Sequence, residues 1–266
     1  MPHENAHKAE VVDYDTFVNW DARLAREAPF FRGIFEDVKA HAVIDVGAGS
    51  GRHAIEFAAW GLSVDAVDPD DSMLRAAEAN VAAANDRIAQ AGGELRLLRG
   101  GFGELRELGL RDADALTCTG NALPHVAGVQ GLRGALADFR AVLKPGGALV
   151  LHLLNHARLL EKRLRSIMPV VREVSEGTRV FLRVIDYPAA DGEFLGLDFV
   201  TLVRDMAGAW TCASHKSAHT LLPASVLRTE LESAGFERIE FFGGHDGQPF
   251  DEAGDESVLV VARRAK

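Results

Sequence analysis

The stretch IDVGAGSGRH, Ile44 to His53, places three glycines between a short apolar run and a segment of helical character. Ala42 to Val46 is apolar and rich in β-branched residues, which is typical of a buried strand. A glycine turn at the carboxyl end of such a strand lets a ligand touch the backbone, because no Cβ intervenes and positive φ is allowed. The helix that follows offers unpaired N–H groups at its start. The stretch therefore predicts a ligand-binding turn at Gly47, Gly49 and Gly51.

Three classes of ligand use this geometry, and the residues around the glycines separate them. A Walker loop ends in Gly-Lys-Ser/Thr, whereas Gly51 is followed by Arg52 and His53, so this class is excluded. A dinucleotide fold has the spacing G-x-G-x-x-G, but here the spacing is G-x-G-x-G, and Asp45 would face a pyrophosphate with the wrong charge. S-adenosylmethionine carries an ammonium group and no phosphate, so Asp45 can accept hydrogen bonds from it, directly or through water.

Short apolar runs alternate with amphipathic segments through the first half of the chain. One or two helices are predicted between Tyr14 and Ala40. Strands are predicted at residues 42–46, 63–67, 95–98, 114–119 and 148–154, and helices at 53–60, about 70–90 and 132–143. This alternation indicates a parallel sheet with helices on both faces.

The second half has a different pattern. A helix over Arg158–Arg165 is followed by longer alternating runs at 179–186, 195–204 and 210–221, which predict antiparallel strands joined by hairpins. The basic cluster from Arg158 to Arg172 is interpreted as an exposed helix or a subunit contact. A helix at 224–234 and strands at 236–242 and 257–262 close the chain. We expect a single domain made of an N-terminal helical cap (1–41), a cofactor-binding core (42–155), an inserted helix with antiparallel strands over the acceptor (156–223), and a final helix and strand pair (224–266).

Composition limits the partners of this chain. It has 266 residues, 47% hydrophobic and 26% charged, with a net charge of -10 and no dense basic block, which argues against nucleic acid as a partner. Its two cysteines, Cys118 and Cys212, lie far apart without a C-x-x-C pattern, so neither a zinc site nor a disulfide framework is expected. No apolar run is long enough to span a membrane. We expect a cytoplasmic monomer or homodimer that acts on a small-molecule acceptor, without a membrane partner and without a metal.

Several motifs resemble those of the class I S-adenosylmethionine-dependent methyltransferases. They are DVGAGSG, VDPDDSML, the loop GNALPH and LKPGGALVL, which together cover about Ala42 to Leu154, and the terminal AGFERIEFF and SVLVVARR. The resemblance implies an α/β, Rossmann-like, seven-stranded and mostly parallel sheet with its last strand antiparallel, helices on both faces and an inserted antiparallel β cap. The segments YDTFVNWDARLARE and GNALPHV are similar to the glycine and sarcosine N-methyltransferases. This implies N-methylation of an amino-acid-like amine.

The cofactor S-adenosyl-L-methionine is expected at the carboxyl ends of the first strands. Asp68 ends the strand VDAVD, where its carboxylate can take both ribose hydroxyls. Many relatives have Gly-Asp-Phe after the third strand, with the Asp on the adenine amino group, but this chain has Gly100-Gly101-Phe102. The adenine contact is therefore expected from the backbone near Phe102 and Gly103, or from elsewhere. The predicted cofactor-binding residues are Tyr14, Trp20, Asp45, Gly47, Gly49, Gly51, Asp68, Pro69, Met73, Phe102 and Gly120.

Candidate catalytic residues follow the fourth strand. Asn121 could hold an amine acceptor or a carboxylate, or could simply stabilise a turn; His125 could be a general base or could cap the next helix. Arg179 and Arg183 share one face of a predicted strand and could clamp a substrate carboxylate, or be solvated. Three alternatives stay open: O-methylation of a hydroxylated or carboxylate metabolite, an NAD-dependent oxidoreductase, and a non-catalytic cofactor-binding scaffold.

Overall fold

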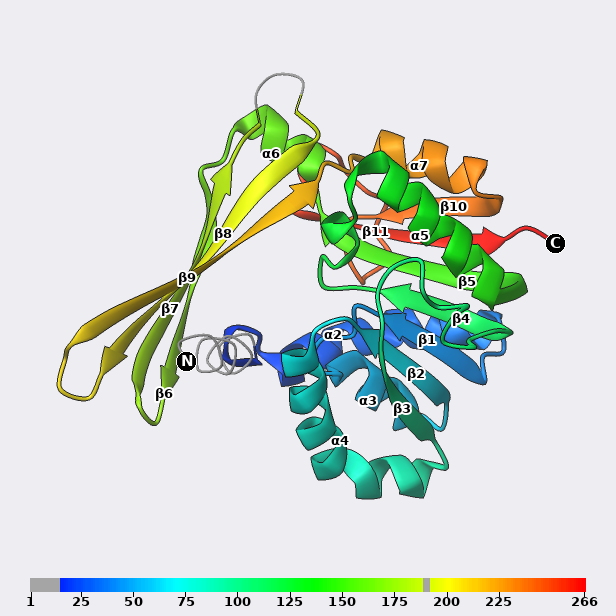
Figure 1. Ribbon diagram of the computed structural model, residues 1–266, viewed down its shortest axis with the longest axis horizontal. Helices are drawn as coiled ribbons and strands as arrows, with labels where there is room; N and C mark the ends of the chain where they lie inside the picture. Colours follow the sequence, from blue (N-terminus) through cyan, green and yellow to red (C-terminus); the bar gives the residue numbers. More distant parts are fainter. Residues whose placement is uncertain (1–14, 189–191) are drawn as a thin grey trace.

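The computed structural model describes residues 15–188 and 192–266, which form two sheets (Figure 1). The larger sheet has seven strands in the order β10-β11-β5-β4-β1-β2-β3. Its strands are β1 Ala42–Val46, β2 Ser63–Asp68, β3 Glu94–Arg99, β4 Ala113–Cys118, β5 Leu143–Leu154, β10 Phe236–Phe242 and β11 Ser257–Arg264. β1 to β5 pair in parallel, whereas β11 runs antiparallel to both β5 and β10. The predicted sheet with a reversed last strand is confirmed.

Helices cover both faces of this sheet (Figure 1). On one face lie α2 Trp20–Asp37, α3 Arg52–Ala58 and α4 Asp71–Ala91, and on the other α5 Gly128–Val142 and α7 Ala224–Ser233. Phe31, Phe57 and Ile88 belong to the buried cluster on the first face, and Leu132, Phe139 and Leu231 to the cluster on the second. Because both faces are covered, the central strands are buried along nearly their whole length, which explains their continuous apolar runs.

Strand order places a crevice at the middle of the sheet. β1 lies between β2 and β4, and the chain crosses to opposite sides of β1 to reach these two neighbours. Ligands of open parallel sheets bind at such a switch point, beyond the carboxyl ends of the strands. The ends of β1, β2 and β4 therefore define where the site is to be sought. Among the described residues, no helix is both long and apolar enough to cross a bilayer.

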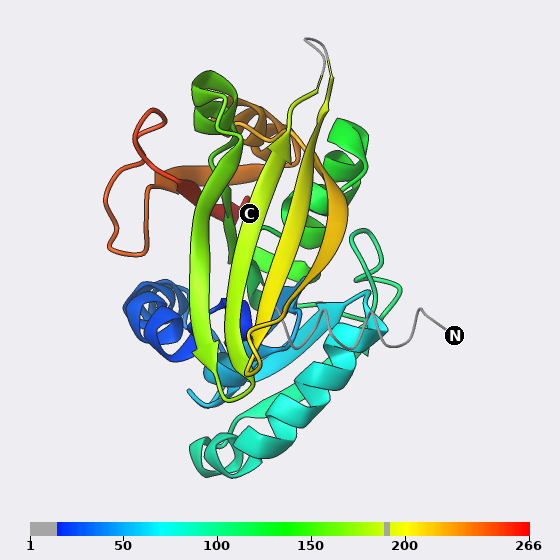
Figure 2. The same ribbon diagram turned by 90° about the vertical axis from the view of Figure 1, so that its left-hand side faces the viewer.

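The second sheet is inserted between β5 and α7 and stands beside the carboxyl ends of the core strands (Figures 1 and 2). It is antiparallel, with the order β6-β7-β8-β9, and follows a short helix. The elements are α6 His156–Lys162, β6 Ser166–Val174, β7 Gly177–Asp186, β8 Phe194–Asp205 and β9 Trp210–Thr220. We call β6 to β9 the cap sheet. The predicted antiparallel insertion is confirmed.

One local prediction about this insertion is wrong. The segment from Arg158 to Arg172 is not a single exposed helix, because α6 ends at Lys162 and β6 begins at Ser166. Arg163 takes the left-handed conformation, with φ 47°, which ends the helix. Pro169 then lies within β6, a position that a strand tolerates when it is at the edge of its sheet, as β6 is.

Candidate functional site

The glycine turn between β1 and α3 is pressed against the loop that follows β4. Gly47, Gly49 and Gly51 all have positive φ, at 69°, 55° and 76°. A Cβ on Gly47 would lie 2.5 Å from the Cβ of Ala122, closer than two such atoms can approach. The backbone N–H groups of Gly47 and Ala48 both donate to the carbonyl of Val67 at the end of β2. These three glycines are therefore required by the backbone conformation, and the turn predicted from the sequence is present.

Two buried carboxylates flank this turn. Asp45, which is 1% exposed, accepts a hydrogen bond of 2.8 Å from Thr117 Oγ1. Asp68, at the end of β2, accepts one from the N–H of Gly49 at 2.7 Å and one from the N–H of Asp70 at 2.9 Å, through different oxygens. Burial raises the pKa of both carboxyl groups, and the two backbone donors act in the opposite direction on the pKa of Asp68. Each oxygen of Asp68 keeps a further lone pair for a ligand hydroxyl.

The loop after β3 contains a carboxylate that sequence reasoning missed. The N–H of Gly101 donates to Glu104 Oε2 at 2.7 Å, so this side chain folds back over the loop. A Cβ on Gly101 would lie 3.8 Å from that oxygen and 4.0 Å from the Cβ of Pro69. The carboxylate of Glu104 thus lies beside the place that an aspartate at position 101 would fill. Phe102, in the same loop, packs against Phe139 with ring centroids 6.0 Å apart.

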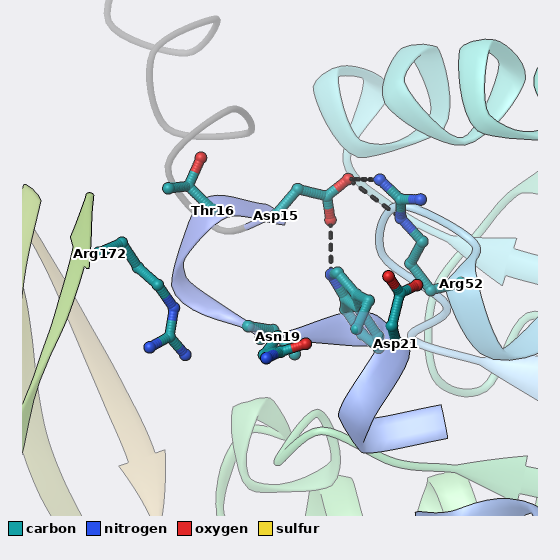
Figure 3. A pocket seen from close by; sticks show the side chains of 8 residues that line it. Asp15, Thr16, Asn19, Asp21, Arg52 and Arg172 are labelled. Carbon is teal, nitrogen blue, oxygen red and sulfur yellow. Dashed lines mark hydrogen bonds and ion pairs between the residues drawn. The ribbon is translucent and has the colours of Figure 1, made fainter. Parts of the chain in front are cut away.

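The segment before α2 is fastened to the glycine turn by Asp15 (Figure 3). Its carboxylate accepts hydrogen bonds from Trp20 Nε1 at 3.0 Å, Ser50 Oγ at 2.5 Å and Arg52 Nη2 at 2.8 Å. A pocket of about 370 Å³ lies here, with Arg172 of β6 on its far side. Sequence reasoning singled out Trp20, which does line this pocket, but not Asp15. Tyr14, also predicted to bind the cofactor, lies outside the described residues.

Asn121 and His125 lie together with a histidine from the cap sheet. Asn121, at φ 68°, accepts a hydrogen bond of 2.9 Å from the N–H of Leu154 through Oδ1, and its Nδ2 lies 3.2 Å from His219 Nδ1. The rings of His125 and His219 are 4.5 Å apart. His219, at the buried end of β9, is 2% exposed, and burial lowers its pKa to about 3. In the sequence His219 stands out only through its spacing of four residues from His215 on one strand face; its contact with Asn121, 98 residues away, has no local sequence signal.

The surroundings of His125 favour its neutral form. It ends the short 3₁₀ turn Leu123–His125, and its pKa is lowered by partial burial and, to a lesser extent, by the charge of His215. A neutral imidazole has one nitrogen that accepts a hydrogen bond or a proton. That nitrogen can therefore accept a hydrogen bond from a bound molecule.

The remaining predicted site residues lie around the same strand ends. Pro69 directly follows β2, Met73 lies in the first turn of α4 and Gly120 follows β4 with φ 68°. Arg179 and Arg183 on β7 face the segment before α2, since Arg179 Nη1 lies 3.5 Å from Thr16 Oγ1 and the Arg183 guanidinium stands 5.2 Å from the ring centre of Phe17.

Comparison with known proteins assigns the core. The sequence model of the family described as "Methyltransferase domain" matches residues 43–147, which run from β1 to the start of β5. The chain carries a class I S-adenosylmethionine-dependent methyltransferase domain. The glycine turn, Asp45 and Asp68 all lie within the matched part of this methyltransferase domain. The match decides against the alternative of an NAD-dependent oxidoreductase.

Two curated proteins that are similar to this part of the chain carry the methyl acceptor in their names. The chain is 33% identical over 149 residues to the glycine/sarcosine N-methyltransferase of Parasynechococcus marenigrum (strain WH8102), a match that covers 56% of this chain and 50% of the relative. It is 31% identical over 156 residues to the enzyme of the same description from Aphanothece halophytica, covering 59% and 56%. The matched part thus spans about half the length of these curated relatives.

A solved structure resembles nearly the whole chain. It is S-adenosylmethionine-bound CalS10, an amino pentose methyltransferase from Micromonospora echinaspora, which is 25% identical, with a TM-score of 0.70 over 97% of this chain and 96% of that one. The likeness therefore extends beyond the methyltransferase domain to the cap sheet and the C-terminal strands.

Proposed function

We propose that this chain transfers the methyl group of S-adenosylmethionine to the nitrogen of a small, amino-acid-like amine. The observation that carries the proposal is the group formed by Asn121, His125 and His219, in which the cap sheet meets the carboxyl end of β4. This group adjoins the glycine turn, because Gly47 packs against Ala122. The choice of nitrogen as acceptor is supported by the names of the curated relatives, which are N-methyltransferases.

The cofactor would lie across the ends of β1 and β2. Its methionine part would follow the glycine turn, with its ammonium toward the Asp45 carboxylate, and its ribose hydroxyls would bind Asp68. The base would then lie over the loop after β3, between Pro69 and Phe102. There Glu104 offers a carboxylate oxygen to the adenine amino group, in place of the aspartate that Gly101 lacks.

Three more of the predicted residues would enclose the same molecule. Met73 and Gly120 border it from α4 and from the end of β4. Trp20, held by Asp15, would place its ring near the sulfonium, where the negative face of the ring favours a cation.

The chemistry needs positioning and one proton acceptor. The lone pair of the acceptor nitrogen attacks the methyl carbon in line with the carbon–sulfur bond, and that bond breaks with its electrons passing to sulfur. Sulfur becomes a neutral thioether, and the nitrogen gains a positive charge that it loses by releasing a proton. His125 would accept this proton, while Asn121 would orient the nitrogen through its remaining hydrogen-bonding capacity.

The cap sheet would enclose the acceptor and exclude water. Arg179 and Arg183, on the side of β7 that faces the site, are candidates to bind an anionic group of the acceptor. Their planar guanidinium groups suit a carboxylate, which fits an amino-acid-like acceptor.

Two measurements test the proposal in sequence. The first is calorimetric titration of S-adenosylhomocysteine, the expected product of the cofactor, into the purified protein. The second is transfer of labelled methyl from S-adenosylmethionine to a panel that contains glycine, sarcosine, amino sugars, hydroxylated metabolites and simple carboxylates. Label found on an amine nitrogen supports the proposal. Label only on oxygen would establish the O-methylation alternative, and binding without transfer to any acceptor would leave a cofactor-binding scaffold.

A further inference from the structure

A line of hydrogen bonds crosses from the core to the cap sheet beside the crevice. It runs from the N–H of Leu154 to Asn121, from there to His219 and Ser217 of β9, and ends at the carbonyl of Leu197 on β8. We call it the His219 network. Sequence reasoning did not single out Ser217, and the proposed reaction leaves it without a role.

Both ring nitrogens of His219 have a partner in this network. Nδ1 lies 3.2 Å from Asn121 Nδ2, and Nε2 lies 3.0 Å from Ser217 Oγ. Asn121 Oδ1 accepts the N–H of Leu154 at 2.9 Å, and the hydroxyl of Ser217 donates to the carbonyl of Leu197 at 3.3 Å. The His219 residue is 2% exposed, so water does not compete for these contacts.

The direction of every bond in the network is fixed by its two ends. A backbone N–H only donates and a backbone carbonyl only accepts. Because the N–H of Leu154 donates, it must meet the amide oxygen of Asn121, and the amide nitrogen then faces His219. That nitrogen donates, so Nδ1 of His219 carries no proton and the ring proton is on Nε2. Nε2 donates to Ser217, whose own hydrogen points to Leu197. His219 is therefore held in a single tautomer.

The network leaves His219 without a nitrogen that could take up a proton. A proton on Nδ1 would displace the N–H of Asn121. Burial lowers the pKa of His219 to about 3 in the same sense, with smaller contributions from His125 and His156. The ring of His125, 4.5 Å away, has no such partner among the described residues. Of these two adjacent rings, only that of His125 has a free acceptor nitrogen.

Asn121 is held in an uncommon backbone conformation. Its φ of 68° lies in the left-handed region, which asparagine tolerates better than most residues. Its N–H donates to the carbonyl of His152 at 3.0 Å, and its side-chain oxygen and nitrogen are each bound once. One lone pair on Oδ1 and one N–H on Nδ2 remain. Backbone conformations of this kind, imposed by the surroundings, cluster at functional sites.

The end of β9 that carries His219 is fixed to the core. Thr220, the next residue, is 1% exposed, and its hydroxyl accepts the N–H of Gly128 at 3.0 Å. Ser217 and His219 are two residues apart and so share one face of the strand. The cap sheet therefore presents both side chains to the loop after β4 in one fixed position.

We propose that Ser217 and His219 are positioning residues for methyl transfer, which hold the amide of Asn121 in one orientation and leave proton uptake to His125. This inference rests on the proposed function, because it concerns the acceptor nitrogen. His219 acts through Asn121 rather than on the reacting atoms. An N–H of the amine can bind the free lone pair of Asn121 Oδ1, which restricts the direction of the nitrogen lone pair that attacks the methyl carbon.

NMR of protein that contains ¹⁵N-labelled histidine shows where the ring proton lies. Protonated and unprotonated ring nitrogens give separate signals, and those of His219 are identified by their absence from His219→Leu. At neutral pH we expect a proton on Nε2 and none on Nδ1. A proton on Nδ1, or a mixture of the two tautomers, would overturn the inference whether or not the protein transfers methyl groups.

Two substitutions of His219 separate its two contacts. The amide of an asparagine side chain lies near the position of Nδ1 and can accept from Asn121, whereas that of glutamine lies near Nε2 and keeps only the contact with Ser217. The substrate is the amine that takes most label in the acceptor panel. The kcat of His219→Asn should stay within roughly threefold of wild type, and that of His219→Gln should fall roughly tenfold, the effect of about one hydrogen bond.

Substitutions of Ser217 test the other side of the ring. Ser217→Ala should lower kcat, and Ser217→Thr, which keeps the hydroxyl, should recover most of it. Ser214→Ala is the matched control, since Ser214 is exposed on the opposite face of β9. The affinity for S-adenosylhomocysteine, measured by calorimetry, should be the same in all these variants, because none of the substituted residues lies at the ends of β1 or β2.

The outcomes separate this inference from the proposed function. Equal kcat values for His219→Asn and His219→Gln would show that the contact with Asn121 does not matter, and would overturn the inference. An unchanged kcat in Ser217→Ala would do the same. If wild type transfers label to no amine, the proposed function itself has failed, whichever tautomer the NMR spectrum shows.

Discussion

Replacing Asp68 by alanine should weaken the binding of S-adenosylhomocysteine by about 1.5 to 3 kcal/mol, or roughly 10- to 150-fold. Each oxygen of Asp68 already holds one backbone N–H, from Gly49 or Asp70, and has one further lone pair. The two ribose hydroxyls can therefore bind one to each oxygen. We take the net loss of binding free energy as that of one hydrogen bond to a charged group, because water that enters the truncated site partly replaces both hydrogen bonds of the ribose hydroxyls.

Calorimetry of S-adenosylhomocysteine with wild type and Asp68→Ala measures this loss. Asp65→Asn is the matched control. Asp65 lies on the same strand but away from the crevice, and its Oδ1 accepts a hydrogen bond of 2.6 Å from Arg96 Nε. Competition by adenosine and by 2′-deoxyadenosine adds a test of position. Wild type should prefer adenosine, and Asp68→Ala should not. Unchanged affinity, or weaker binding with the same preference for the ribose, would refute the placement of the sugar.

Three further perturbations have defined outcomes. Gly101→Asp should tighten S-adenosylhomocysteine binding, or restore it in a Glu104→Ala background. The space beside Pro69 is open, and the φ of Gly101 suits any residue. Weaker binding than wild type in both backgrounds, measured by calorimetry, would contradict this. His219→Leu should reduce kcat at least tenfold with little change in cofactor affinity, since it removes the partner of Asn121; an unchanged kcat in the labelled-methyl assay would count against a role for this group. The urea concentration at the midpoint of unfolding should fall as the pH is lowered from 6.5 toward 4. In this range the histidines become protonated in the unfolded chain but stay neutral in the folded one, so the free energy of unfolding decreases by up to about 1.4 kcal/mol per pH unit for each histidine. A midpoint that does not change with pH would contradict the buried neutral state of these histidines. The histidines concerned, with pKa values of about 3 or about 4, are His152, His156, His219 and His245.

Local patterns were sufficient to predict the core of this fold. The strand at residues 42–46 and the helix after it follow from a short apolar run, a glycine turn and the change to helical periodicity, all within about a dozen residues of one another. The final antiparallel pair was predicted by resemblance, and the order of the strands confirms it. β6 was missed because Pro169 interrupts a run that otherwise alternates, and its position at the edge of a sheet depends on pairing with β7.

The site was predictable only where one short segment supplies the residues. Asn121 and His125 stand in one loop, and the turn glycines in another, so both groups could be read from spacing. Asp15 and His219 reach the same crevice from the segment before α2 and from the last strand of the cap sheet. Such contacts between distant segments depend on how the insertion packs, which no single stretch of sequence encodes.

The chain enters and leaves the inserted cap at neighbouring points of the core. Asn155, between β5 and α6, binds the carbonyls of Glu252 and Asp255 through its amide nitrogen, while His156 Nδ1 accepts the N–H of Leu222 where the chain returns to the core. Entry and exit are therefore tied to each other, and farther along the cap sheet Phe181 and Phe199 pack on Phe17 of the segment before α2. On the proposed function, changes in the hairpins of the cap sheet would alter which acceptors are admitted while the ends of β1 and β2 keep their residues. Proteins with this architecture could therefore change their acceptor by changes in the cap sheet and keep the same methyl donor.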